Sequence, residues 1–171
     1  FQTATSSEAR ALLGVNTDPL GVTTVTVGVG GDYTTISAAL AGITDASSSK
    51  RYSLILISDT TETTAITWKD YVFCDLRGFK VTITDTSSAA GITVSTATTN
   101  AWFFNGEIFR TTGTLADTVV LRVSSTSGNT VRFVNLRIQN SINVAGCHGI
   151  VCEGGCNVSF QNLLPVSSST S

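Results

Sequence analysis

The chain has 171 residues, the size of one ordinary domain, and a net charge of −2 at pH 7. Its composition, 42% hydrophobic and 13% charged, is that of a folded protein and excludes an intrinsically disordered chain. The small net charge provides no broad attraction to nucleic acid or to an anionic membrane, and no apolar run approaches the ~18–20 residues of a membrane span. We therefore expect neither nucleic-acid binding nor membrane insertion.

The first twenty residues are predicted to connect the rest of the chain to an upstream anchoring region. Residues 6–13 have the pattern of a short capped helix, which Gly14 can end, and residues 16–19 form a turn signal. The chain begins at Phe1, contains no Met and ends in a serine-rich run. We interpret the sequence as a window from a longer polypeptide.

Residues 21–46 are predicted to form a capping strand and a capping helix. Residues 22–29 alternate valine with threonine or glycine, as a half-buried strand does. After a glycine-rich turn, Ile36, Ala39, Leu40 and Ile43 recur at helical spacing. We expect a helix over residues 35–43 that covers the first coil of strands and hides an edge open to pairing with other chains.

From residue 47 onward the chain repeats itself. Segments 71–79, 101–109 and 131–139 align with one another at a constant shift of 30 residues. A fourth, weaker copy at 160–163 matches 133–136. A period of about 30 residues is the mark of a solenoid, and the short aromatic and β-branched runs are strand-like. The predicted fold class is all-β: a right-handed, single-stranded parallel β-helix (β-solenoid) with ~30-residue rungs. Its first coils would occupy residues 47–171 and continue beyond them.

The constant offset predicts columns of residues on successive coils. Two outward columns are expected, one of Asp75, Asn105 and Asn135, and one of Arg77, Glu107 and Arg137. The second alternates in charge, as cross-strand pairs prefer. Two inward columns are expected at Cys74, Phe104 and Val134, and at Leu76, Gly106 and Leu136. A further column of Phe73, Phe103 and Phe133 breaks the alternation, which predicts a bend near residue 73 of the coil.

Residues 27–36 read Val-Gly-Val-Gly-Gly-Asp-Tyr-Thr-Thr-Ile, followed by Ala-Ala-Leu at 38–40. This segment resembles the G-G-D-Y-T-T-I-x-x-A-L opening of pectin-lyase-like right-handed β-helix proteins, where it forms a strand and a capping helix. Residues 6–14 are similar to the S-x-x-E-A-R-x-A-L-G connector of bacteriophage tail-fibre proteins.

Together the two resemblances imply the structural part of a phage tailspike or tail fibre, located in the virion. They also imply a homotrimer that contacts other tail proteins through residues 1–20 and is a scaffold for recognition of host-surface polysaccharide. The alternative is the N-terminal part of a secreted, pectin-active or other polysaccharide-degrading β-helix enzyme.

Catalytic candidates are the carboxylates Asp75, Glu107 and Glu153. Polysaccharide hydrolysis needs two carboxyl groups about 5–5.5 Å or about 6.5–9.5 Å apart. Asp75 and Glu107 are expected to be diagonal neighbours, and Glu153 could pair with a carboxylate beyond residue 171. Glu107 between two arginines would be held as a carboxylate and would serve poorly as an acid. The glutamine and aspartate signature of pectinesterases is absent, so we predict no activity within this fragment.

Candidates for glycan binding are Trp102, as a stacking platform, and Arg77 and Arg137, as anion-binding groups. A packed aromatic ring and a structural ion-pair column are the competing interpretations. The only metal-like cluster is Cys147, His148, Cys152 and Cys156, whose spacing does not match the C-x₂-C pairs of zinc sites. Zinc, a disulfide and free thiols all remain open, with free thiols favoured. No metal or cofactor is expected.

Overall fold

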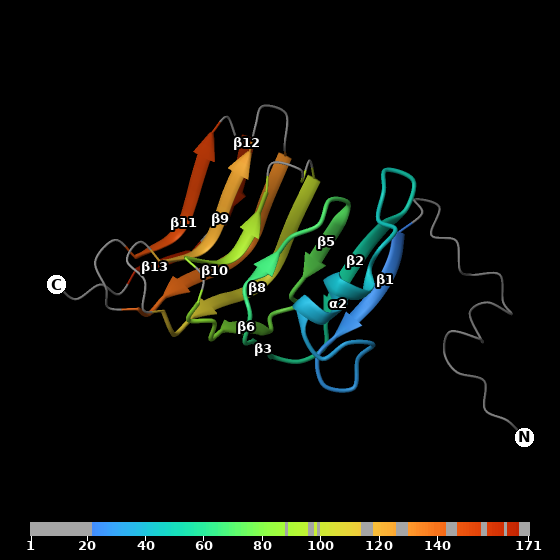
Figure 1. Cartoon of the computed structure of the whole chain (residues 1–171), viewed down its shortest axis with the longest axis horizontal. Coiled ribbons are helices and arrows are strands. Elements are labelled where there is room, and N and C mark those ends of the chain that lie inside the picture. Colours follow the sequence, from blue (N-terminus) through green and yellow to red (C-terminus); the bar gives the residue numbers. More distant parts are fainter. Residues whose placement is uncertain are drawn as a thin grey trace, which may run out of the picture.

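The computed structural model describes residues 22–87, 89–95, 98, 100–113, 118–125, 130–142, 147–154, 157–162 and 164–167. Within these ranges the protein is a parallel β-solenoid of about four turns with one short helix, α2 (Ile36–Gly42), near its N-terminal end (Figure 1). The predicted all-β parallel β-helix is therefore confirmed. The helix expected in residues 6–13 lies outside the described residues.

Two parallel sheets form the sides of the solenoid. The larger contains β1 (Val22–Val27), β2 (Arg51–Leu56), β3 (Thr60–Glu62), β5 (Val72–Asp75), β6 (Lys80–Ile83), β8 (Asn100–Arg110), β10 (Thr130–Asn140), β12 (Asn157–Gln161) and β13 (Leu164–Ser167). The smaller contains β4 (Ile66–Thr67), β7 (Ala90–Val94), β9 (Val119–Ser125) and β11 (His148–Gly154). Parallel neighbours require a crossover, and here each crossover is the remainder of a coil.

The core is built from columns of apolar side chains on successive coils. Leu54, Cys74, Phe103 and Phe133 are in register with one another, and each is at most 1% exposed. The rings of Phe103 and Phe133 stack at 5.3 Å between centroids. Burial raises the pKa of the Cys74 thiol far above its ordinary value of 9.0. Cys74 is therefore a neutral filler of the core.

The register between β5 and β8 differs from the predicted column of Phe73, Phe103 and Phe133. Phe73 is in register with Trp102, and Cys74 with Phe103, so this offset is one residue shorter than the predicted period. Phe103 and Phe133 do share a column, as predicted. Phe104 and Val134, however, are half-buried on the outer face, whereas Phe103 and Phe133 occupy the core. A slip of one residue exchanges the two faces of a strand.

A turn at residues 76–79 then changes the offset again. Arg77 and Gly78 lie there with positive φ angles of 49° and 86°, and Lys80 then pairs with Glu107 at a still shorter offset. On the following coils a single asparagine makes the same bend, with φ of 55° at Asn105 and 52° at Asn135. The bend was expected near residue 73, and it lies a few residues further along the chain. Asparagine tolerates this left-handed conformation better than most residues.

Helix α2 caps the first coil, in agreement with the prediction for residues 35–43. The Thr35 side chain accepts a hydrogen bond from the Ala38 N–H at 3.2 Å. The side chain of Glu62, a fully buried residue of the first coil, accepts bonds from the N–H groups of Ile36 at 2.6 Å and Ser37 at 3.2 Å. Ile36 and Leu40 are buried in the core, so α2 closes the solenoid from that end.

The residues of the glycine-rich segment serve the turn that leads into α2. The Asp32 carboxylate accepts hydrogen bonds at 2.8 Å from both the N–H and the hydroxyl of Thr26. A Cβ atom on Gly31 would lie 2.9 Å from the Thr26 carbonyl oxygen. These roles are structural and fix the turn at the start of the fold.

Candidate functional site

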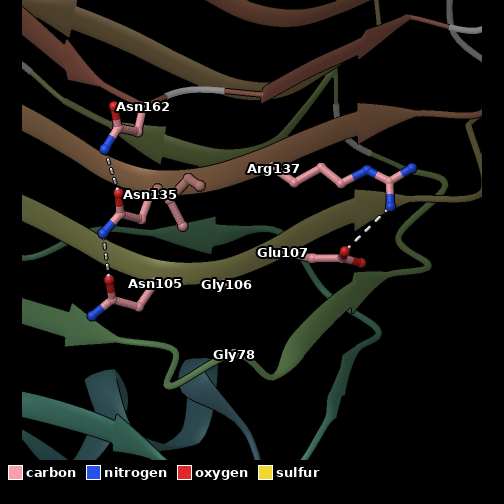
Figure 2. Close-up of a pocket in the computed structure, with 8 residues that line it drawn as sticks. Gly78, Asn105, Gly106, Glu107, Asn135, Arg137 and Asn162 are labelled. Carbon is pink, nitrogen blue, oxygen red and sulfur yellow. Dashed lines mark hydrogen bonds and ion pairs between the residues drawn. The ribbon is translucent and has the colours of Figure 1, made fainter.

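An open groove of about 660 Å³ lies on the outer surface at the bend of β8 and β10. Figure 2 shows three asparagines, Asn105, Asn135 and Asn162, along one side of it and the side chains of Glu107 and Arg137 on the other. Gly78 and Gly106 lie between these two sides. The groove therefore combines amides, an ion pair and exposed backbone.

The asparagines form a continuous hydrogen-bonded ladder. The Asn105 amide donates to Asp75 Oδ1 at 3.2 Å, Asn135 donates to Asn105 at 3.0 Å, and Asn162 donates to Asn135 at 2.9 Å. Asn105 and Asn135 share a column, as predicted, whereas Asp75 is in register with Phe104 and reaches the ladder only through its side chain. An amide has two N–H groups, and within the described residues each asparagine donates one of them, which leaves the other for an incoming ligand. All three asparagines are exposed.

The glycines keep the centre of the groove free of side chains. A Cβ atom on Gly106 would lie 2.4 Å from Leu76 Cβ and 2.6 Å from the Phe79 carbonyl oxygen, because the two coils approach closely there. A Cβ atom on Gly78 would meet nothing within 4 Å, so the space beside it is open. Close approach favours glycine at position 106, and the positive φ angle of 86° favours it at position 78.

The ion pair on the other side joins Arg137 Nη1 to Glu107 Oε1 at 3.2 Å. Both side chains are about 40% exposed, so the pair contributes only ~0–1 kcal/mol to stability and stays accessible. Arg77 was expected in the same column and is not there. Lys80 holds that register position, while Arg77 is exposed in the turn and donates its backbone N–H to Asp75.

The candidate carboxylates do not form the expected diagonal pair. Asp75 is in register with Phe104, and Glu107 is in register with Lys80 beyond the bend. Asp75 is occupied by the asparagine ladder, and Glu107 by Arg137. Glu153 lies on the smaller sheet, where it accepts a bond from the Ser124 hydroxyl at 3.1 Å and lies 3.9 Å from Arg122 Nε.

Trp102 lies on the outer face of β8, ahead of the bend and outside the lining of the groove. The Arg132 guanidinium is 4.9 Å from the centre of its ring, and the Phe73 ring is 5.4 Å away. Of the three predicted glycan-binding residues, only Arg137 lines the groove. Arg77 is outside the lining but precedes Gly78, which is part of it. Trp102 packs instead with Phe73, Phe104 and Arg132.

Within the described ranges, no three His, Cys, Asp or Glu side chains are placed to share a metal ion. Cys147 is a free thiol, Cys152 is an exposed residue of β11, and Cys156 lies outside those ranges. Among the same residues, no helix is long and apolar enough to cross a membrane.

Sequence reasoning did not select the asparagines as site residues, although it aligned them. Asn105 and Asn135 were placed in one column, and the match of 160–163 to 133–136 brings Asn162 into line with Asn135. A recurrent asparagine at the position of a bend was the available signal.

The fold and the groove define the class of molecule, a parallel β-helix with an open groove on its outer surface. Comparisons with protein-family models, curated proteins and solved structures gave no match to this chain.

Proposed function

We propose that this chain is a scaffold for recognition of host-surface polysaccharide within a phage tailspike or tail fibre. The observation that carries the proposal is the groove at the bend, in which the asparagine ladder faces the Glu107–Arg137 pair. The resemblance of residues 27–40 to the opening of β-helix proteins supports the same class of molecule.

A sugar chain suits the chemistry of this groove. Sugars carry hydroxyl groups that accept and donate hydrogen bonds, and the ladder offers amide N–H groups on three successive coils. These donors repeat at the ~4.7–4.9 Å spacing of neighbouring strands, so they suit an extended polymer aligned with the solenoid axis. Arg137 and Glu107 add a donor and an acceptor that can exchange their mutual bond for bonds to the ligand.

The scaffold also suits recognition because it is rigid. Most of the groove residues lie on β8 and β10, whose register holds over ten pairs on the two sides of the bend. Binding groups on paired strands are placed more precisely than groups on loops. In the proposed virion appendage, residues 1–20 would connect to other tail proteins, and a homotrimer would add the weak contacts of three grooves.

Equilibrium binding of the chain to purified host-surface polysaccharides tests the proposal. Arg137→Met should weaken binding at least about tenfold, because it removes the cation from the groove. Arg122→Met is the matched control, since Arg122 forms a similar ion pair with Glu153 on the other sheet. Equal effects of the two substitutions, or no binding to any polysaccharide of a susceptible host, would contradict the proposal.

A further inference from the structure

A second surface feature lies ahead of the bend, on the outer face of β5, β8 and β10. Two outward columns are adjacent there, and their registers run Phe73–Trp102–Arg132 and Asp75–Phe104–Val134. We call these six residues the aromatic patch. Ser53 precedes the first column and Ile55 the second, and the polar residues Ser159 and Gln161 follow them. A mainly apolar centre with polar residues at its border is typical of an interface core with its rim.

The patch is internally packed. The ring of Trp102 is 5.4 Å from that of Phe73 and 5.8 Å from that of Phe104, and Arg132 lies over it at 4.9 Å. The Trp102 indole N–H has no hydrogen-bond partner within the described part of the chain. Tryptophan and arginine are the residue types most enriched at the energetic centres of protein interfaces.

The arrangement is poorly suited to a sugar. A stacking platform needs an open ring face, and Arg132 covers a face of the Trp102 ring. Small ligands prefer concave sites, whereas the patch is the face of a paired sheet and contributes no residue to the groove. A second protein surface is the better occupant.

The charges of the patch favour a second copy of this chain. Within the six residues, Asp75 lies on β5 in one column and Arg132 lies on β10 in the other, so they occupy opposite corners. The other two corners are Phe73 and Val134. When two copies meet face to face about a two-fold axis that runs along the Phe73–Val134 diagonal, each Arg132 meets the Asp75 of the other copy. The aromatic rows then meet at the centre. Such self-complementarity is what an isologous contact requires, and a two-fold contact of this kind would pair chains of two different homotrimers.

We propose that the aromatic patch is a contact surface between copies of this chain. The inference depends on the patch alone and is independent of glycan binding in the groove. Sedimentation velocity over about 1–100 μM is expected to show association of the wild-type chain. Phe104→Lys should weaken it at least about tenfold by placing a charge at the apolar centre.

Phe109→Lys is the matched control, because Phe109 is a half-buried aromatic residue of the same strand beyond the bend. It should leave association unchanged. Circular dichroism of each variant shows whether it is folded. Wild-type chain that stays monomeric up to about 100 μM, or equal effects of the two substitutions, would overturn the proposal. A monomer in which Phe104→Lys abolishes polysaccharide binding would assign the patch to the sugar instead.

A charge exchange tests the corner pairing. Arg132→Glu and Asp75→Lys should each associate more weakly than wild type, because like charges then meet at both corners. A mixture of the two variants pairs opposite charges at both corners and should recover association to within about threefold of wild type. A mixture as weak as the separate variants would refute this contact.

Discussion

At the scale of single residues, the asparagines of the bend combine two properties that few other side chains share. Asn105, Asn135 and Asn162 tolerate φ angles of 52–55°, and each amide donates to the coil before it. Glycine would satisfy only the backbone, and most other residues neither requirement. The same position therefore sets the bend and lines the groove.

Substitutions of Asn135 separate these two contributions. Asn135→Gly should cost about 1–2 kcal/mol, because the bonds to Asn105 and Asn162 are lost at a partly solvated site. Asn135→Ala should cost about 1 kcal/mol more, because alanine also strains at positive φ. Urea denaturation measures both. Equal stability of the two variants would show that the backbone conformation is of no consequence there.

Asp32 predicts a pH dependence of stability. Its hydrogen bonds from Thr26 hold the pKa of the carboxyl below its ordinary value of 3.8. The folded pKa is therefore lower than the unfolded one, so the stabilisation is present above pH ~3.8 and is lost as the pH falls through the folded pKa. The wild-type advantage over Asp32→Asn should shrink between about pH 5 and pH 2.5. Denaturation curves at both pH values test this, and a constant difference would contradict it.

At the scale of elements, α2 is held less by its length than by its partners. Seven residues are too few for a stable isolated helix. The helix forms because Glu62 binds its first N–H groups and because Ile36, Ala39 and Leu40 pack on the end of the solenoid. A capping element of this kind gains its stability from the coil that it covers.

Leu40→Asp should therefore destabilise the protein by about 3–5 kcal/mol, through a buried and unpaired charge. Ala41→Asp is the control, because Ala41 is exposed on the same helix and should cost less than about 1 kcal/mol. Chemical denaturation gives both values. A loss below about 1 kcal/mol for Leu40→Asp would mean that α2 is not docked on the core.

At the scale of the whole molecule, stacking of coils places each candidate carboxylate beside a partner from another coil. Asp75 meets Asn105, Glu107 meets Arg137, and Glu153 meets Ser124. Glycoside hydrolysis instead needs two carboxyl groups free to act on the same bond.

We accordingly predict that this chain does not cleave polysaccharide. Incubation with host-surface polysaccharide or pectin should release no reducing ends, and the polymer should keep its length. Release that Glu107→Gln abolishes would contradict the prediction and would favour the secreted-enzyme alternative.

The sequence by itself determined the architecture and the cap. The constant period of the repeated segments predicts stacked coils, because only neighbouring repeats can cover each other's apolar face. The spacing of Ile36, Leu40 and Ile43 predicts the helix, since a helical stripe places these residues on one face. Both signals are periodic patterns within the chain, so they can be recognised without knowing how the coils pair.

Only the tertiary structure decided which residues face outward around the bend. The offset between paired residues differs on the two sides of the turn at Arg77 and Gly78. An alignment with one constant period cannot predict such a change. The pairing places Cys74 opposite Phe103, leaves Phe104 and Val134 on the outer face, and places Lys80 rather than Arg77 opposite Glu107. Register depends on how two coils pair, so a single coil's sequence leaves both the groove and the aromatic patch unspecified.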